Sequence, residues 1–240
     1  MKNSRKYNGY SIVIPILNEE RNLVKLLKKI KKSLKKFKFE IIFIDDNSSD
    51  KTHHLLKKIK KKYNFINYHI RKKNPDLSLS CILGFNKSKY SNIIVMDGDL
   101  QHDPKYLPKM ANIFQNRKLD FLVGARNFDK FNIPGLSIIR FIASKILIYI
   151  FYLLVGKKTK DPMSGFFIFN KKFYLHNKKR LFGQGYKILP DLIYSNKKEI
   201  KVEDFNIVFN LRNKGKSKMN IKVLINIMFF IFFNFYRKLF

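Results

Sequence analysis

The stretch Ile93-Ile-Val-Met-Asp-Gly-Asp-Leu-Gln-His-Asp-Pro104 joins an apolar run to an acidic turn. Its leading apolar residues are typical of a buried strand, and that strand ends on two carboxylates, Asp97 and Asp99. In open α/β sheets, ligands bind just beyond the carboxyl ends of the strands. Two carboxylates at such an edge suit a hard divalent cation that also binds substrate phosphates. The alternative interpretation is a solvated acidic turn, because short acidic turns are common at strand ends.

The chain on both sides of this stretch alternates strands with helices. Repeated strand–helix units of this length predict an α/β fold, a mostly parallel, Rossmann-like sheet with helices on both faces. Proline is unusual inside a sheet, so Pro15 is expected to end the first strand. Strands are expected at residues 11–16, 40–45, 66–71, 91–96, 121–125 and 202–209. Helices are expected at residues 22–36, 78–89, 104–115 and around 185–192, and a further Lys-rich helix is expected to end near Tyr63.

The loops after the first, second and fourth of these strands are acidic. No Gly-x-Gly-x-x-Gly follows the first strand and no Walker lysine loop occurs, which argues against dinucleotide dehydrogenases and P-loop enzymes. Acidic loops can instead hydrogen-bond a base and a ribose, and hold a metal ion for a diphosphate. For Asp45 and Asp46, capping of the following helix is the alternative role.

The composition is strongly basic. The 240 residues include 50 Lys and Arg against 17 Asp and Glu, a formal net charge of +33. Such a charge favours a polyanionic neighbour, whether nucleic acid, acidic lipid or a phosphorylated substrate. Genomic base bias is an alternative source, because Lys, Asn, Ile and Phe all have A- and T-rich codons. The single cysteine, Cys81, excludes an internal disulfide, and the polar residues 1–10 predict no secretion signal.

Two apolar segments lie in the second half of the chain. Residues 133–155 contain Arg140 and Lys145, whereas a spanning helix needs about 20 apolar residues without central charges. We therefore expect amphipathic membrane-interface helices, with an ordinary buried helix as the alternative. Residues 221–240 are expected to form a tail that lies on a membrane or inserts weakly, with flanking cations near anionic head groups. Residues 1–220 are expected to form the main domain.

A cationic segment lies near the end of this domain. Arg212-Asn-Lys-Gly-Lys-Ser-Lys218 carries its charges around one glycine. A mobile basic loop of this kind is suited to close over a diphosphate. A solvated charged linker is the alternative.

With these parts in place, the sequence resembles the family 2 glycosyltransferases of the GT-A fold, and among them the polyprenyl-phosphate sugar synthases of the dolichol-phosphate mannosyltransferase type. The resemblance runs from Ser11 to about Asn220, and the order and spacing of its motifs make it specific. The matching motifs are Ile14-Pro-Ile-Leu-Asn-Glu-Glu20, Asp45-Asp-Asn-Ser-Ser-Asp-Lys-Thr52, Met96-Asp-Gly-Asp-Leu-Gln-His-Asp-Pro104, Val123-Gly-Ala-Arg126, Asp161-Pro-Met-Ser-Gly-Phe166 and Arg212…Gly215-Lys-Ser-Lys218.

The resemblance implies a role for each matching residue. Donor binding, metal binding and acceptor binding would fall to separate groups, with Asp97, Asp99, Arg126 and Asp161 as the catalytic set. Asp161 would orient rather than act as a strong base. The nucleoside would be held by Pro15, Asn18, Glu19 and Asp46, and Mg²⁺ or Mn²⁺ would be bound by Asp97, Asp99 and Gln101. The acceptor phosphate would be received by Arg126, Arg140 and Ser144, and the donor phosphates would be clamped by Arg212 and Lys218.

The implied reaction is an inverting transfer of a hexose, with mannose from GDP-mannose as the first candidate, to a polyprenyl or dolichyl phosphate. It would take place at the cytoplasmic face of a membrane, on a peripheral or weakly anchored enzyme. A phosphate acceptor, with a second pKa of about 6, is already an anion at neutral pH. It needs no strong general base, whereas a sugar hydroxyl would.

Some positions depart from the family pattern, and other functions remain open. The family usually has alanine at Gly98, glycine at Lys51 and often glycine at Asp76. One alternative is another nucleotide sugar, such as UDP-glucose, or a saccharide acceptor in cell-envelope glycan synthesis. A nucleic-acid-binding protein is disfavoured, because the basic residues are spread over all helices instead of one face with stacking aromatics. A non-catalytic scaffold is disfavoured by the intact Asp97 and Asp99 pair.

Overall fold

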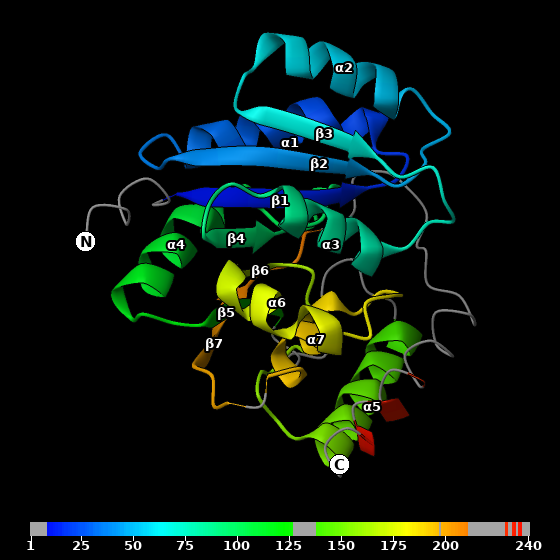
Figure 1. Cartoon of the computed structure of the whole chain (residues 1–240), viewed down its shortest axis with the longest axis vertical. Helices are drawn as coiled ribbons and strands as arrows, with labels where there is room; N and C mark the ends of the chain where they lie inside the picture. Colours follow the sequence, from blue (N-terminus) through cyan, green and yellow to red (C-terminus); the bar gives the residue numbers. More distant parts are fainter. Residues whose placement is uncertain are drawn as a thin grey trace.

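A seven-stranded sheet in the order β3-β2-β1-β4-β6-β5-β7 organises the molecule (Figure 1). The computed structural model describes residues 9–126, 138–196 and 198–210, together with residues 229, 232, 233, 235 and 236. The strands are β1 (Tyr10–Ile16), β2 (Phe39–Asp45), β3 (Ile66–Ile70), β4 (Asn92–Val95), β5 (Phe121–Arg126), β6 (Phe167–Asn170) and β7 (Val202–Ile207). The α-helices are α1 (Glu20–Ser33), α2 (Thr52–Lys62), α3 (Leu77–Lys87), α4 (Leu107–Asn116), α5 (Ile138–Val155), α6 (Lys171–Asn177) and α7 (Ile188–Tyr194), and short 3₁₀ turns are η2 (Pro104–Tyr106) and η3 (Lys178–Arg180).

The prediction of a mostly parallel α/β sheet is confirmed. The strand pairs β1–β2, β1–β4, β2–β3 and β5–β7 are parallel. β6 is antiparallel to both of its neighbours, β4 and β5, and the sequence reading contained no strand there. β6 joins the two halves of the sheet and places the segment before it at the carboxyl edge of β4.

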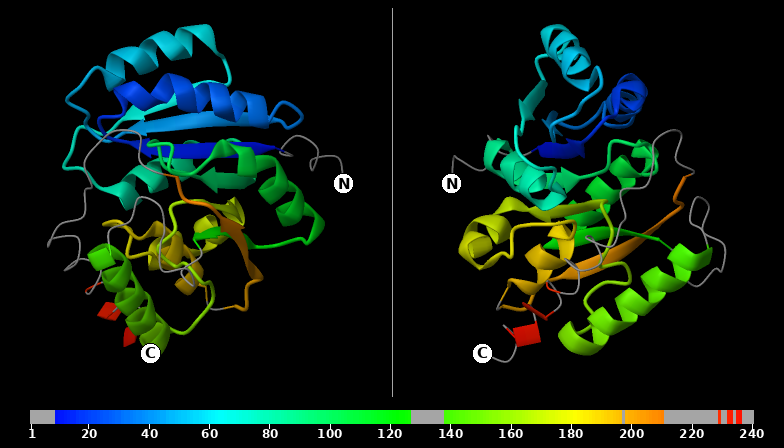
Figure 2. Two further views of the ribbon diagram at one scale, coloured as in Figure 1. Left: turned by 180° about the vertical axis from the view of Figure 1, so that it is seen from behind. Right: turned by 90° about the vertical axis from the view of Figure 1, so that its right-hand side faces the viewer.

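The alternation of side chains along the strands builds a core on each face of the sheet. Ile12 and Ile14 of β1 belong to the core under α1, α2 and α4. Val13, between them, points to the opposite core, under α3, α6 and α7. Figure 2 shows the sheet between these two helical layers. Both faces are covered, so the carboxyl ends of the strands remain as the place for a ligand.

Pro15 does not end the first strand, contrary to expectation. β1 continues through Ile16, and Pro15 pairs with Ile44 of β2. The ladder between β1 and β4 stops at Val13 and Val95. The backbone nitrogen of residue 15 faces the β4 side of β1, where the ladder has already ended. The N–H that proline lacks would therefore have had no partner in the sheet.

Helix α5 packs on the edge of the α/β unit, at the opposite end of the molecule from α2 (Figure 1). Phe151 is fully buried against Phe182, Tyr186 and Tyr194. A second side of the helix exposes Ile142, Ile146, Tyr149 and Leu153, spaced as one helical stripe. Within the described residues, no helix combines the length and hydropathy that a bilayer crossing requires.

Candidate active site

A pocket of about 160 Å³ opens where β1 and β4 end. Five residues expected at the donor site share this pocket, although they come from separate loops. They are Pro15, Glu19, Asp46, Asp97 and Asp99, and the remaining lining residues are Ile16, Leu17, Pro75, Asp76, Leu77, Gly98 and Tyr186. The pocket is called the donor pocket below.

The turn after β4 presents the two carboxylates differently. Asp99 is buried, and its Oδ1 accepts the Gln101 N–H at 3.1 Å. The Asp97 side chain is 35% exposed. A Cβ at Gly98 would stand 2.6 Å from Cγ2 of Ile16, so glycine at this position leaves room for the Ile16 side chain. The turn therefore fixes Asp99 and leaves Asp97 facing the pocket.

The loops after β1 and β2 are tied to each other through Asn18. Its side-chain oxygen accepts the Ser49 N–H at 2.8 Å, and its own N–H donates to Ser48 Oγ at 2.8 Å. Asn18 has a φ of 58°, a conformation that asparagine tolerates better than most residues. Asn18 does not line the donor pocket; in this structure it joins the two loops instead of bordering the pocket.

Asp46 lines the pocket and is held from behind. It forms an ion pair with Arg71 and accepts the Asp76 N–H at 2.6 Å. Burial raises the pKa of Asp46, while the Asp76 N–H and Arg71 oppose this shift. Asp46 does not cap helix α2, which was its alternative role. At the N-terminus of α2 it is Asp50 that accepts the Thr52 N–H, at 2.9 Å. Arg71 had no expected role.

Arg126 and Asp161 form a two-pronged ion pair beside the pocket. The guanidinium donates from Nε at 2.7 Å and from Nη2 at 2.9 Å, and the Arg126 backbone N–H also donates to Asp161, at 3.2 Å. Asp161 is fully buried. Burial opposes the charge on Arg126, but Asp161 outweighs it and raises the pKa of Arg126. Asp161 is therefore placed to orient Arg126.

His102 supports this region from within the core. Its ring stacks on Phe166 with centroids 5.2 Å apart and meets Phe209 edge-on at 5.4 Å. Burial lowers the pKa of His102 to about 4, so the imidazole is neutral near pH 7. Its Nδ1 accepts the Asp97 N–H at 3.4 Å. The role of His102 here is to pack and to hold the Asp97 backbone.

Lys187 is a functional candidate that sequence reasoning did not select. It stands at the N-terminus of α7, directly after the pocket residue Tyr186. Burial and the nearby Arg126 lower the pKa of Lys187 to about 8, and Asp161 and Asp97 oppose this shift. Lys187 thus adds a cation whose charge interacts with Arg126, Asp161 and Asp97. In a chain with this many lysines, only the fold singles it out.

Of the remaining expected site residues, the side chain of Gln101 is described and those of four others are not. Gln101 donates from Nε2 to the Asn210 carbonyl at 3.4 Å, and the Asn210 N–H donates to the Gln101 carbonyl at 3.0 Å. The segment that leads to Arg212 and Lys218 is thereby fixed beside Asp99. Arg212 and Lys218 themselves, and the side chains of Arg140 and Ser144 on α5, lie outside the described residues.

The carboxylates at the pocket fit a divalent cation that is completed by substrate. No group of three or more His, Cys, Asp or Glu side chains in the described segments could hold a metal ion alone. Magnesium sites commonly use one or two carboxylates together with substrate phosphates. Asp97 and Asp99 supply that number of oxygen-donating side chains on one pocket wall. The donor set therefore suits Mg²⁺ or Mn²⁺ bound with a diphosphate.

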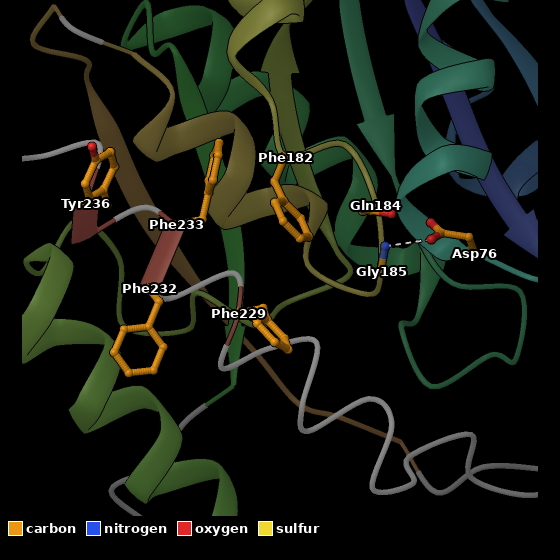
Figure 3. A pocket seen from close by; sticks show the side chains of 8 residues that line it. All are labelled: Asp76, Phe182, Gln184, Gly185, Phe229, Phe232, Phe233 and Tyr236. Carbon is orange, nitrogen blue, oxygen red and sulfur yellow. Dashed lines mark hydrogen bonds between the residues drawn. The ribbon is translucent and has the colours of Figure 1, made fainter. Parts of the chain in front are cut away.

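A second, larger cavity adjoins the donor pocket. Its volume is about 600 Å³, and Asp76 lines both spaces. Figure 3 shows the side chains that line this cavity, among them aromatic rings from two segments. They belong to Phe182, Phe229, Phe232, Phe233 and Tyr236, with Gln184 and Gly185 completing the lining. Phe182 and Phe233 lie 5.3 Å apart between ring centroids. The cavity is called the aromatic pocket below.

Comparison with solved structures supports the fold. Glucosyl-3-phosphoglycerate synthase from Mycobacterium tuberculosis, in complex with Mn²⁺, UDP-glucose and phosphoglyceric acid, superposes with a TM-score of 0.68. The match covers 95% of this chain and 80% of that one at 14% sequence identity. It shows that the sheet and its helices have the GT-A arrangement.

Comparison of sequences gives the family. Dolichol-phosphate mannosyltransferase of Pyrococcus furiosus is 31% identical over 89% of this chain, which spans 60% of that relative's length. Dolichol-phosphate mannosyltransferase of Saccharomyces cerevisiae is 27% identical, with 90% of this chain and 83% of the relative covered. The family model for glycosyl transferase family 2 matches residues 11–176, more than half of the chain. The chain therefore belongs to glycosyl transferase family 2.

Proposed function

We propose that this protein transfers a hexose from a nucleotide sugar to a polyprenyl phosphate, with a bound divalent cation and inversion at the sugar carbon. Mannose from GDP-mannose is the first candidate donor, because the relatives in P. furiosus and S. cerevisiae are dolichol-phosphate mannosyltransferases. One observation carries the proposal most directly. The pocket that contains Asp97 and Asp99 shares the Asp76 wall with a larger pocket lined by aromatic rings, as expected for a charged donor beside a lipid-linked acceptor.

The residues of the donor pocket suggest a task for each end of a nucleotide sugar. Pro15, Glu19 and Asp46 line the pocket and would border the nucleoside, and Asp97 and Asp99 would border the diphosphate. When bound there, Mg²⁺ or Mn²⁺ would offset the charge that develops on the departing nucleoside diphosphate. Lys187 and Arg126 add positive charge close enough to Asp97 to interact with it. These cations would reduce the repulsion between the diphosphate and an incoming phosphate.

The environment of Asp161 favours an acceptor that needs no strong base. Its carboxylate accepts two hydrogen bonds from the Arg126 guanidinium and lies fully buried. A base must reach the proton that it removes, and Asp161 is instead committed to Arg126. A phosphate oxygen, already an anion near neutral pH, can attack the sugar carbon without proton removal. Arg140 and Ser144, on α5, are proposed to join Arg126 at that phosphate.

A membrane surface is the proposed working place. The exposed stripe of α5 and the exposed rings at 229, 232, 233 and 236 are apolar, and the chain carries a net charge of +33. Apolar burial together with attraction to anionic lipids is the usual basis of interfacial binding. We place this membrane contact at the cytoplasmic face, with the protein peripheral or weakly anchored.

The test supplies purified full-length protein with polyprenyl phosphate, Mn²⁺ and either radiolabelled GDP-mannose or radiolabelled UDP-glucose. The proposal expects label in the organic phase with a polyprenyl phosphate, and a product of inverted anomeric configuration by NMR. Label on a soluble saccharide but never on the lipid would contradict it. Arg140→Ala should raise the KM for polyprenyl phosphate and leave the KM for the donor near its wild-type value. The opposite split would remove Arg140 from the acceptor site.

A further inference from the structure

Asp76 occupies the boundary between the two pockets. It lines the donor pocket together with Asp46 and Tyr186, and it lines the aromatic pocket together with Phe182 and Gly185. Figure 3 shows its carboxylate directed at the Gly185 backbone. A side chain in this position can affect how the two pockets are separated.

The Asp76 carboxylate joins two segments that are far apart in the sequence. Its Oδ2 accepts the Gly185 N–H at 2.7 Å, and its Oδ1 accepts the Leu79 N–H at 2.9 Å. The Ser78 N–H donates to the Gly185 carbonyl at 2.9 Å. One carboxylate therefore caps α3 and, with Ser78, holds the loop that leads into α7.

That loop depends on such external bonds for its shape. Gly183 has a φ of 73° and Gly185 a φ of 86°. Glycine enters this region without a steric penalty, but it also leaves it easily. On the far side, Asp191 accepts the N–H groups of Phe182 at 3.0 Å and Gly183 at 2.8 Å. The Asp76 and Ser78 bonds hold the other end of the loop, next to the donor pocket.

The same residue is linked to the nucleoside end. The Asp76 N–H donates to Asp46 at 2.6 Å, and its carbonyl accepts from Arg71 at 3.3 Å. Beyond Gly185 the chain continues into Tyr186, which lines the donor pocket, and then into Lys187. Asp76 thus lies between the residues that border the nucleoside and the residues that border the reacting groups.

We propose that Asp76 is a positioning residue: its carboxylate fixes the 183–186 loop as the wall between donor and acceptor, and so directs the sugar to the acceptor instead of to water. This inference rests on the proposed transfer to a polyprenyl phosphate. With the loop released, Tyr186 and the aromatic wall move away from the donor, and water reaches the sugar carbon. The donor is then hydrolysed to free sugar and nucleoside diphosphate, with water as the nucleophile.

Asp76→Asn is the sharpest test, because it keeps the size of the side chain. The amide oxygen can accept only one of the two N–H groups well, and the amide NH₂ cannot accept at all. Asp120→Asn is the matched control. Asp120 also holds a distant loop, accepting the Lys201 N–H at 3.0 Å, but it precedes β5 at the opposite edge of the sheet.

The measurement is the ratio of sugar released into water to sugar found on polyprenyl phosphate, with labelled donor and full-length protein. For Asp76→Asn we expect this ratio to rise about tenfold and lipid transfer to slow by about ten- to hundredfold, the range that a misplaced wall can cause. The far-ultraviolet circular dichroism spectrum should match that of wild type. A general loss of structure would change that spectrum as well.

An unchanged ratio in Asp76→Asn, or an equal rise in Asp120→Asn, would overturn the inference. If Asp76→Asn does not fold, Gly185→Ala tests the same loop, because alanine is strained at a φ of 86°; its ratio should also rise, and an unchanged ratio would again overturn the inference. A wild-type protein that transfers nothing to polyprenyl phosphate would instead refute the proposed function, which keeps the two failures distinct.

Discussion

Gly165 lies directly against the carboxylate of Asp97. A Cβ at position 165 would stand 2.8 Å from both Asp97 oxygens, closer than van der Waals contact allows. The segment before β6 reaches Asp97 because β6 pairs beside β4. The glycine of the Asp161-Pro-Met-Ser-Gly165 motif is therefore explained by the space that a proposed metal ligand needs.

Gly165→Ala should impair the metal site more than the fold. The Asp97 side chain is partly exposed and can turn toward solvent, so we expect a loss of about 1 kcal/mol or less in unfolding free energy. Transfer should fall by about tenfold or more, and half-saturation should need more Mn²⁺. Urea denaturation measures the unfolding free energy, and Mn²⁺ titration of activity measures the transfer rate and the Mn²⁺ requirement.

Gly84→Ala is the contrasting control for that prediction. Its Cβ would stand 2.3 Å from Cγ1 of Val13, in the packed interface of α3 with β1. We expect a loss of about 1–3 kcal/mol in stability, as for other overpacked cores, with the Mn²⁺ requirement unchanged in the folded fraction. If Gly165→Ala left the Mn²⁺ requirement unchanged, Asp97 would not bind the ion.

Asp161→Asn should destabilise the protein through Arg126. The substitution removes the charge that faces a guanidinium with only a small exposed fraction, so we expect a loss of about 3 kcal/mol. Glu203→Gln is the control, because the Arg117–Glu203 pair is exposed and such pairs contribute about 1 kcal/mol or less. Equal losses in urea denaturation of the two variants would contradict the assigned role of Asp161.

Lys187 predicts a decline of activity at alkaline pH. The pKa of Lys187 is lowered to about 8, so its positive charge is lost as the pH rises through that value. The pH dependence of kcat/KM reports ionisations of the free enzyme, and kcat/KM for the donor should therefore fall above about pH 8. Lys187→Arg keeps its charge, because the arginine pKa exceeds about 12, and should weaken this decline. An identical decline in wild type and Lys187→Arg would show that ionisation of Lys187 does not cause the loss of activity.

The exposed stripe of α5 predicts where the protein meets lipid. Ile146→Glu combined with Leu153→Glu should reduce partition onto anionic vesicles by about tenfold or more, since each buried apolar side chain contributes about 1.5–3 kcal/mol. Leu175→Glu is the matched control, because Leu175 is similarly exposed but lies on α6. Vesicle sedimentation measures both. Equal effects of the two changes would refute the assignment of this face.

Much of the fold was predictable because buried parallel strands occur in the sequence as short runs of apolar residues. Residues 40–45 and 91–96 were identified in this way, and the observed β2 and β4 differ from them by at most one residue at each end. β6 was missed because it has four residues and pairs antiparallel between distant strands. The second half of the sheet depends on that pairing, which no local pattern reveals.

The candidate site was predictable where a motif places chemistry at a strand end. Pro15, Asp46, Asp97 and Asp99 come together in this way. Asp76 was noticed only as a departure, because its partner Gly185 is 109 residues away. Arg71 and Lys187 are ordinary cations in a chain of many, and their positions follow only from the packing of α3 and α7 against the sheet.

Binding of a divalent cation by Asp97 and Asp99 is tested by metal-dependent transfer in wild type and Asp99→Ala. Purified full-length protein receives labelled GDP-mannose and polyprenyl phosphate in vesicles, with Mn²⁺ or with a chelator, and label is counted in the organic phase. We predict transfer by wild type only with Mn²⁺, and a loss of about hundredfold or more in Asp99→Ala. Undiminished transfer by Asp99→Ala, or by wild type in chelator, would contradict a cation held by Asp97 and Asp99.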